Sequence, residues 1–148
     1  MSEQKQSLID RAIYATVIVA DDHPMVRKAV CSLLGSRKKF RECVEVADGN
    51  EAVLKSLELH PRLVILDAAM PVLDGFGAAK KIREALPEVP ILMFTADASP
   101  ELAQFTQSVG AQGIVRKTEH GGVLLKAVDV LLGGGTFFPE LDHGPGIR

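Results

Sequence analysis

The sequence predicts an α/β protein built as a single (βα)5 unit, with one doubly wound parallel sheet and helices on both of its faces. Short apolar runs rich in β-branched residues alternate with longer segments that carry apolar residues at helical spacing. The run at 63–66 is apolar at every position, which is typical of a parallel strand covered on both faces. Because βαβ crossovers are right-handed, helices that alternate with five such strands must cover both sides of the sheet.

Local signals set the limits of each element. Pro24 suits the first turn of a helix, Ser99 suits the residue before one, and Pro61 and Pro87 end two others. The expected strands are 14–20, 43–47, 63–66, 91–94 and 114–115, and the expected helices are 24–35, 50–59, 76–86, 100–109 and 119–132. Residues 1–13 are expected to form an N-terminal extension, 14–133 the folded domain and 134–148 a C-terminal tail or linker.

The composition is that of an ordinary globular chain. Of its 148 residues, 47% are hydrophobic and 24% are charged, which argues against disorder. A net charge of -2 without a long basic run argues against nucleic acid or an anionic membrane as the primary partner of this domain. No apolar segment approaches the ~18 residues of a membrane span, and the first residues lack the apolar core of a signal peptide. A cytoplasmic location is therefore expected.

Polar side chains stand where four of the expected strands end. Asp21 and Asp22 follow the first strand, Asp67 the third, Thr95 the fourth and Lys117 the fifth. A parallel sheet brings these residues to its carboxyl edge, where ligands collect in open α/β sheets. Carboxylates that share one pocket repel one another, so the cluster predicts a compensating cation, and hard oxygen ligands suit Mg²⁺. With that cation bound, one carboxylate can act as a nucleophile toward a phosphoryl group.

Four motifs resemble those of one family, the CheY-like receiver domain of two-component response regulators. They are VIVADDHPMVR, LVILDAAMPVLDG, MFTA and the position of Lys117, in the order and at the spacing of the family. The match covers residues 15 to about 133. The wording ADDHPMVR, with GGTFFPEL after the last helix, is more specifically similar to receivers of the NarL or LuxR type. The resemblance implies the flavodoxin-like strand order 2-1-3-4-5 and a role in bacterial signal transduction.

The resemblance also implies roles for the acidic residues. Asp67 is the expected phosphoacceptor. Asp22 and Asp67 are expected to ligate Mg²⁺ through their carboxylates, and Ala69 through its backbone carbonyl. Asp21 is expected to help hold the same ion through a water molecule.

Around the phosphoryl group the chain matches the family at some positions and differs from it at two others. Thr95 and Lys117 are expected to bind the phosphoryl oxygens, and the small Ala96 leaves access to the acceptor. Ile114 occupies the position three before the lysine, where the family has an aromatic latch, so the coupling of threonine and latch must be altered. Thr118 follows the lysine in place of proline, which removes the cis-proline turn common in the family.

The partners follow from the same resemblance. A histidine kinase or a histidine phosphotransfer protein is the implied donor, and the domain is expected to catalyse only its own phosphorylation and dephosphorylation. We expect the readout on the face made by the helix 100–109, the fifth strand and the helix 119–132, because Thr95 and Lys117 lead directly into them. A dimer partner or an effector protein would bind that face. This domain is not expected to bind nucleic acid or a membrane directly.

Cysteines and histidines indicate no further metal site. Cys31 and Cys43 are the only cysteines, and both are expected to be buried or half-buried thiols because disulfides are rare in the cytosol. The spacings of the four histidines match no ligand motif, which favours solvated or capping roles. They are His23, His60, His120 and His143. His23, beside Asp22 at the mouth of the expected pocket, could affect donor access or dephosphorylation.

Four alternatives remain open at this point. A flavodoxin-like binding protein would need a Ser/Thr/Gly-rich phosphate loop after the first strand, where this chain has ADDHP. An aspartate-nucleophile phosphatase would need a general acid two residues after Asp67, where Ala69 stands. A pseudo-receiver that is never phosphorylated would lack at least one pocket residue, and none is lost here. The chain could also be the receiver part of a longer DNA-binding transcriptional regulator.

Overall fold

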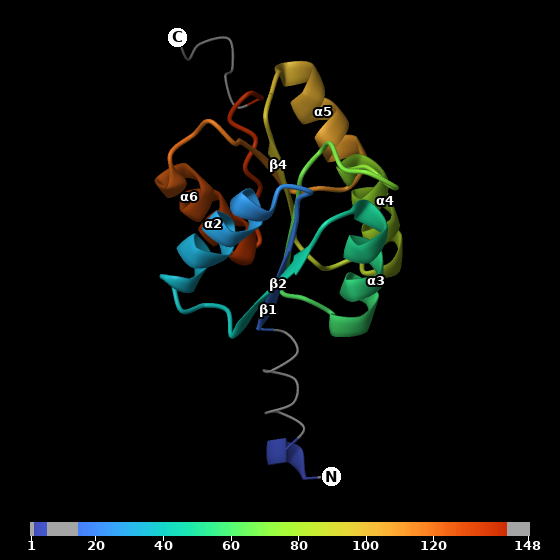
Figure 1. Ribbon diagram of the computed structural model, residues 1–148, viewed down its shortest axis with the longest axis vertical. Coiled ribbons are helices and arrows are strands. Elements are labelled where there is room, and N and C mark those ends of the chain that lie inside the picture. The colour runs from blue at the N-terminus through green and yellow to red at the C-terminus, as the bar shows by residue number, and fades with distance from the viewer. Residues whose placement is uncertain (1, 6–14, 142–148) are drawn as a thin grey trace.

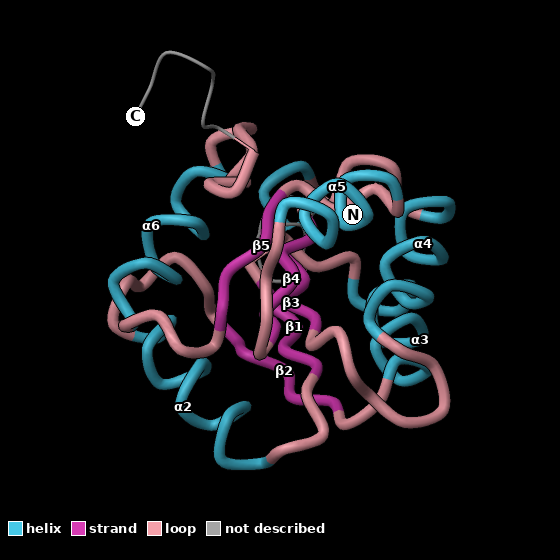
Figure 2. The backbone as a smooth tube through the Cα atoms, turned by 90° about the horizontal axis from the view of Figure 1, so that it is seen from above, coloured by secondary structure: helices cyan, strands magenta, loops and turns pink. Residues whose placement is uncertain are grey.

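A five-stranded parallel sheet forms the centre of the computed structural model, which describes residues 2–5 and 15–141. The strands are β1 (Thr16–Ala20), β2 (Glu42–Val46), β3 (Leu63–Leu66), β4 (Ile91–Thr95) and β5 (Gly113–Arg116). They lie side by side in the order β2-β1-β3-β4-β5, which Figure 2 shows from above. The predicted fold class and strand order are therefore confirmed.

Helices cover both faces of the sheet. The helices α2 (Pro24–Gly35) and α6 (Gly121–Leu132) lie on one face, and α3 (Gly49–Leu59), α4 (Gly75–Ala85) and α5 (Pro100–Ser108) lie on the other (Figure 1). In the described part of the chain no helix has the length and apolar character needed to span a bilayer.

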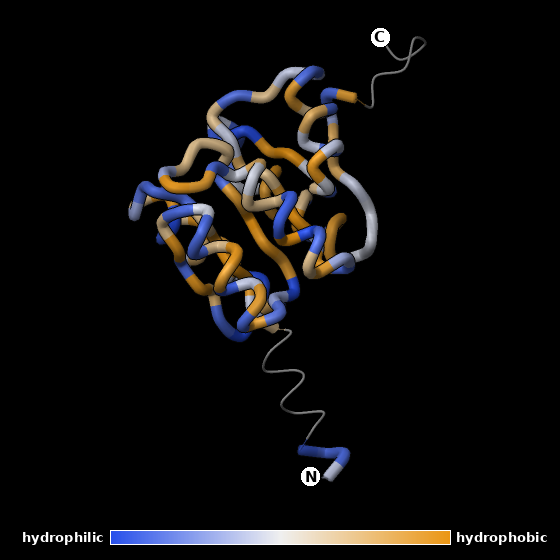
Figure 3. Tube along the Cα trace, turned by 90° about the vertical axis from the view of Figure 1, so that its right-hand side faces the viewer, coloured by the Kyte–Doolittle hydropathy of each residue, from blue (hydrophilic) through white to orange (hydrophobic). Residues whose placement is uncertain are grey.

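The strands bury side chains on both faces because successive residues of a strand point in opposite directions. Ile18, Val64 and Met93 belong to the core beneath α3, α4 and α5. Val17 and Leu63 belong to the core beneath α2 and α6. Full burial of one such side chain is worth about 1.5–3 kcal/mol, so two apolar layers hold the carboxyl edge of the sheet in place. Along the helices of the α3–α5 side, hydrophobic positions alternate with hydrophilic ones (Figure 3).

Side-chain caps fix where α3, α4 and α5 begin. The side chain of Asp48 accepts a hydrogen bond from Glu51 N, that of Asp74 from Gly77 N, and that of Ser99 from Leu102 N. Such caps satisfy backbone donors that have no partner inside the helix. The predicted capping role of Ser99 is confirmed.

Some expected element details differ from the structure. The expected first strand began at Tyr14, which lies outside the described residues, and the observed strand begins at Thr16. Leu57 and Phe105 were expected on apolar faces, but they are 43% and 50% exposed. The face of α3 that is buried carries Ala52 and Ser56, and Leu57 is turned about 100° away from Ser56 around the helix axis.

The prediction of two thiols is wrong: Cys31 and Cys43 form a disulfide. Cys31 lies on α2 and Cys43 on the neighbouring β2, with their Cα atoms 5.7 Å apart. That separation is within the range that a disulfide spans. The expectation rested on the redox compartment and could not include the distance between a helix and a strand that pack together.

After α6 the chain returns to the sheet. Phe137 forms a parallel bridge with Gly113, donating from its N to Gln112 O at 2.8 Å and accepting from Ile114 N at 3.0 Å. Phe138 is buried in the core beneath α5. Phe137 therefore extends the sheet at the free edge of β5, and Phe138 packs into the core beside it.

Candidate functional site

The carboxyl ends of four strands deliver the polar residues to one edge of the sheet. Asp21 follows β1, Asp67 follows β3, Thr95 ends β4 and Lys117 follows β5. Asp67 N donates to Ala20 O at 2.9 Å, and Lys117 N donates to Thr95 O at 2.7 Å. These backbone bonds continue the sheet by one residue beyond each strand. The backbone therefore sets the positions of the polar side chains.

The ammonium of Lys117 lies between two buried carboxylates. Its Nζ is 2.6 Å from Asp21 Oδ2 and 3.2 Å from Asp67 Oδ2. Asp21 is 1% exposed and Asp67 4% exposed, so both charges are largely removed from water. A buried carboxylate needs an opposite charge or hydrogen bonds to stay ionised. Lys117 provides that charge for both.

The pKa values follow from this arrangement. Burial raises the pKa of Asp67, and the nearby charge of Asp21 raises it further, while Lys117 and a hydrogen bond from Ala69 N act in the opposite direction. Burial lowers the pKa of Lys117, but its close ion pair with Asp21, together with the charge of Asp67, outweighs burial and leaves that pKa raised. Lys117 is therefore held as a cation, whereas the negative charge of Asp67 is unfavourable in the folded state.

Asp22 and His23 form the exposed rim. His23 Nδ1 lies 3.0 Å from Asp21 Oδ1 and 3.0 Å from Asp22 Oδ1, and His23 N donates to Asp21 Oδ1 at 2.9 Å. The side chain of His23 is 67% exposed and that of Asp22 is 38% exposed. The sequence predicted His23 at the mouth of the pocket. Its contacts with the carboxylates of Asp21 and Asp22 depend on the shape of the turn between β1 and α2, which the sequence alone does not give.

The donor set fits a hard divalent cation. Ligand atoms of Asp21, Asp22, His23 and Asp67 all lie within 4.8 Å of one another. Buried Asp21 Oδ2 accepts no hydrogen bond of good geometry in the described structure, although the Lys117 ammonium lies beside it. Three carboxylates that converge from two strand ends are the oxygen ligands that Mg²⁺ prefers.

The remaining predicted residues surround this cluster. Thr95 is 6% exposed, and its Oγ1 accepts from Asp97 N at 3.4 Å. Ala69 and Ala96 are exposed at the rim. Ile114 is 1% exposed and belongs to the core beneath α5, so it does not reach the rim. The structure therefore brings Asp21, Asp67 and Lys117 into contact, places Asp22 beside them and leaves Ile114 inside the core.

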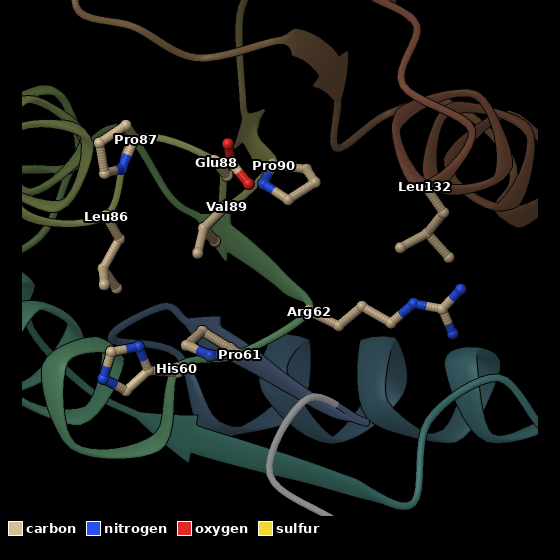
Figure 4. A pocket seen from close by; sticks show the side chains of 9 residues that line it. All are labelled: His60, Pro61, Arg62, Leu86, Pro87, Glu88, Val89, Pro90 and Leu132. Atoms are coloured by element: carbon tan, nitrogen blue, oxygen red, sulfur yellow. The ribbon is translucent and has the colours of Figure 1, made fainter. Parts of the chain in front are cut away.

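A separate pocket of about 400 Å³ lies at the opposite edge of the sheet, before β3 and β4 (Figure 4). It is lined by His60, Pro61, Arg62, Leu86, Pro87, Glu88, Val89, Pro90 and Leu132. Glu88 is the one carboxylate among these lining residues, and none of the predicted site residues lies there. Because the charged groups converge at the carboxyl edge of the sheet, we take that edge, and not this pocket, as the candidate functional site.

Fold and site together define a doubly wound α/β domain with an acidic pocket at the carboxyl edge of its sheet. The chain belongs to the family of response regulator receiver domains, whose model matches residues 17–129. It is thus a receiver domain of two-component response regulators.

Curated relatives are longer than this chain. The transcriptional regulatory protein LnrK of Bacillus subtilis is 33% identical over 123 residues, which are 83% of this chain and 56% of LnrK. The response regulator protein VraR of Staphylococcus aureus is 31% identical over 126 residues, which are 84% of this chain and 60% of VraR. The chain therefore spans little more than half the length of these relatives.

Solved structures give the same family. A LuxR-family two-component response regulator from Aurantimonas sp. SI85-9A1 superposes with a TM-score of 0.78 at 29% identity, covering 89% of this chain and 91% of that one. The isolated receiver domain of RcsB from Salmonella enterica serovar Typhimurium, solved in the presence of the phosphomimetic BeF3-, has a TM-score of 0.77 at 28% identity, covering 86% and 94%. The predicted likeness to LuxR-type receivers is confirmed.

Proposed function

We propose that Asp67 accepts a phosphoryl group from a histidine kinase or a histidine phosphotransfer protein. One observation carries the proposal: Lys117 Nζ lies 3.2 Å from Asp67 Oδ2 at the rim where three carboxylates converge. A structural ion pair would need one carboxylate, whereas phosphoryl transfer needs a nucleophile, a cation site and a fixed positive charge. Asp67, the acidic cluster and Lys117 supply these three.

The transfer forms one bond and breaks one. An Asp67 carboxylate oxygen attacks the phosphorus of the donor phosphohistidine, the P–N bond breaks, and the imidazole leaves with the electron pair of that bond. The product is an acyl phosphate on Asp67. Lys117 binds one phosphoryl oxygen and Thr95 donates its hydroxyl hydrogen to another, which stabilises charge on the transferring group. Ala96 carries only a methyl group at the rim, so the donor can approach.

Three carboxylates and one backbone carbonyl would hold Mg²⁺. Asp22 and Asp67 would bind it through their side chains, Ala69 through its carbonyl, and Asp21 through water. An ion held there would supply positive charge that offsets the charge of the phosphoryl oxygens. Hard oxygen donors within 4.8 Å of one another support this assignment.

The domain acts on itself only. Ala68 and Ala69 follow the acceptor and carry no acid or amide side chain that could activate water for repeated turnover. We therefore assign catalysis of its own phosphorylation and dephosphorylation, and no external substrate. Residues 14–133 are the proposed receiver domain, with 1–13 as an extension and 134–148 as the tail or linker.

The output face is made by α5, β5 and α6. Thr95 ends β4 and is followed by α5, and Lys117 lies between β5 and α6. If either residue moves toward a phosphoryl group, the elements next to it shift as well. A dimer partner or an effector protein binds there. Because LnrK is a transcriptional regulatory protein of which this chain spans 56%, we propose as a second possibility that the domain controls a DNA-binding module of a longer regulator.

The test is phosphorylation by a small-molecule donor. The chain is incubated with Mg²⁺ and acetyl phosphate or phosphoramidate, and intact mass is measured. We expect the mass gain of one phosphoryl group, lost when Mg²⁺ is chelated and absent in Asp67→Asn. Glu84→Gln, which removes an exposed carboxylate on α4, is the matched control and should gain the same mass. A chain that takes up no phosphoryl group at Asp67 is a pseudo-receiver, and the proposal fails.

A second measurement addresses the output face. Amide chemical shifts are compared with and without BeF3- in the presence of Mg²⁺. Changes that extend through α5, β5 and α6 support the proposed readout. Changes confined to the pocket rim would exclude it.

A further inference from the structure

A disulfide and an ion pair lie next to each other between α2 and β2. One is the disulfide between Cys31 and Cys43, and the other is the ion pair in which Arg27 Nε lies 3.1 Å from Glu45 Oε1. Arg27 precedes Cys31 by one helical turn, and Glu45 follows Cys43 by two residues on the same face of the strand. Four helical residues rise ~6 Å and two strand residues ~6.6 Å, so the two links are about equally far apart on both elements, which run antiparallel. We call the Arg27–Glu45 pair the upper rung and the disulfide the lower rung. Figure 1 shows α2 beside β2.

The upper rung reaches the acidic pocket. Arg27 Nη1 donates to the backbone carbonyl of Asp21 at 2.8 Å, so the same guanidinium binds β2 and the end of β1. From the other side, Asp21 N donates to Val46 O of β2 at 3.1 Å. Asp21 is thus held by the two elements that the disulfide joins, and its carboxylate is the one nearest to Lys117.

The disulfide lies where it can be opened. Cys31 and Cys43 are both half-buried, so neither is enclosed in the core. β2 is an edge strand, paired on one side to β1, and four of its five residues are half-buried or exposed. The one buried residue of β2, Val46, packs on the α3 side of the sheet and not against α2. A disulfide that small thiols can reach at a sheet edge is typical of a labile, regulatory bond.

We propose that Cys31 and Cys43 are a redox-modification site that sets the Mg²⁺ affinity of the acidic pocket through Arg27. The oxidised pair closes the lower rung and keeps Arg27 on the Asp21 carbonyl. Reduction leaves α2 and β2 joined at this point by the salt bridges of Glu45 with Arg27 and, at 4.0 Å, with Lys28, and Asp21 loses its fixed position. This inference rests on the proposed role of Asp21 in the Mg²⁺ site.

The chemistry is thiol–disulfide exchange with a low-molecular-weight disulfide such as glutathione disulfide. One cysteine thiolate attacks a sulfur of glutathione disulfide, forms a mixed disulfide and releases one glutathione. The second cysteine thiolate attacks the protein sulfur of that mixed disulfide and releases the other glutathione. The protein loses two electrons and two protons, and glutathione disulfide gains them as two thiols. Reduction is the reverse sequence.

The experiment uses the full chain equilibrated in buffers of different reduced-to-oxidised glutathione ratio. Free thiols are alkylated and counted by intact mass, and Mg²⁺ affinity is measured by titration calorimetry on each form. We expect reversible interconversion, and a Kd for Mg²⁺ that is about tenfold weaker in the reduced form, as for other residues that orient metal ligands. Hydrogen exchange should be faster at Asp21 N in the reduced form.

Variants separate this role from a general effect on stability. Cys31→Ser with Cys43→Ser should bind Mg²⁺ like the reduced chain and show no response to glutathione disulfide. Arg27→Gln keeps the disulfide but removes the connection to Asp21, so its oxidised and reduced forms should bind Mg²⁺ equally. Lys55→Gln removes an exposed ion pair on α3 and should keep the full redox response.

Three outcomes overturn the inference. They are a disulfide that stays closed in a large excess of reduced glutathione, equal Mg²⁺ affinity in the two forms of the parent chain, and an undiminished redox response in Arg27→Gln. A lower melting temperature on reduction with unchanged Mg²⁺ affinity would mean that the bond only stabilises the fold. Phosphorylation is measured separately: a parent chain that accepts phosphoryl but binds Mg²⁺ equally in both forms refutes this inference alone, whereas one that accepts no phosphoryl in either form refutes the proposed function.

Discussion

Lys117 Nζ lies 3.2 Å from Asp67 Oδ2, where β5 and β3 end at the same edge of the sheet. The same ammonium lies 2.6 Å from Asp21 Oδ2, so one cation serves two buried carboxylates. The pocket therefore holds more negative than positive charge among these groups. The first two predictions follow from that imbalance.

Lys117→Met should destabilise the chain by about 3 kcal/mol in the absence of Mg²⁺. Breaking a buried ion pair leaves its carboxylates without a compensating charge, and the lysine side chain is 19% exposed. Urea unfolding at neutral pH measures the loss. Saturating Mg²⁺ should recover part of it, because the ion supplies positive charge at the same carboxylates.

The matched control for Lys117→Met is Lys126→Met, which removes an exposed lysine of α6. Its unfolding midpoint should stay close to that of the parent chain. If Lys117→Met were as stable as this control, the carboxylates of Asp21 and Asp67 would not depend on the ammonium.

Asp67→Asn should be more stable than the parent chain at neutral pH. Burial, and then the charge of Asp21, raise the pKa of Asp67 above its usual 3.8 in the folded state. The ionised carboxylate therefore costs folding free energy above the folded pKa. As the pH falls through that value toward 3.8, Asp67 takes up a proton and the cost disappears. The difference between variant and parent should shrink over the same range, measured by urea unfolding at a series of pH values.

Glu84→Gln is the control for that series, because it removes one exposed carboxylate of α4 and leaves the pocket intact. Its difference from the parent chain should be small and nearly constant with pH. A parent chain that is more stable than Asp67→Asn at neutral pH would show that the attraction of Lys117 exceeds the cost of burial.

Much of this site could be predicted from the sequence, because the end of a strand can be recognised from neighbouring residues alone. A buried strand such as β3 is recognised by its continuous apolar run, and in a parallel sheet the next residue, Asp67, must lie at the carboxyl edge. Asp21 and Lys117 follow by the same reasoning. Ser99 could likewise be recognised as a cap from its place before Pro100.

Contacts between elements that are distant in sequence could not be predicted in the same way. The Cys31–Cys43 bond depends on how closely α2 approaches β2, and neither segment alone indicates that distance. Phe137 bridges to Gly113 only because the chain turns back after α6, and its apolar neighbours looked like part of a tail. Phe105 of α5 packs on Phe76 of α4, with ring centroids 4.9 Å apart, and is still 50% exposed; neither helix alone indicates this pairing.

Arg83→Met should destabilise the chain by about 3 kcal/mol. The guanidinium donates to Gly110 O, Leu86 O, Pro87 O, Val89 O and Gln112 Oε1 at distances between 2.6 and 3.1 Å. Charge-assisted hydrogen bonds of this kind are each worth about 1.5–3 kcal/mol and do not add independently. Urea unfolding measures the effect.

Arg83→Lys should also be destabilised, because an ammonium cannot reproduce the planar fork that joins the α4–β4 and α5–β5 connections. Lys81→Met, an exposed position on the same helix, serves as the control and should change stability little. A fully stable Arg83→Lys would mean that charge alone, without the fork, holds these loops.

Ile114→Phe places an aromatic ring where the family has its latch and should destabilise the chain by about 1–3 kcal/mol. Ile114 is 1% exposed in a close-packed core, so a larger ring must displace its neighbours or turn outward. Ile114→Val, which removes one methylene, should cost about 0.5–1.5 kcal/mol and gives the reference for a change without overpacking. Urea unfolding compares the two variants with the parent chain. A neutral or stabilising Ile114→Phe would show that the core has space for an aromatic latch at this position.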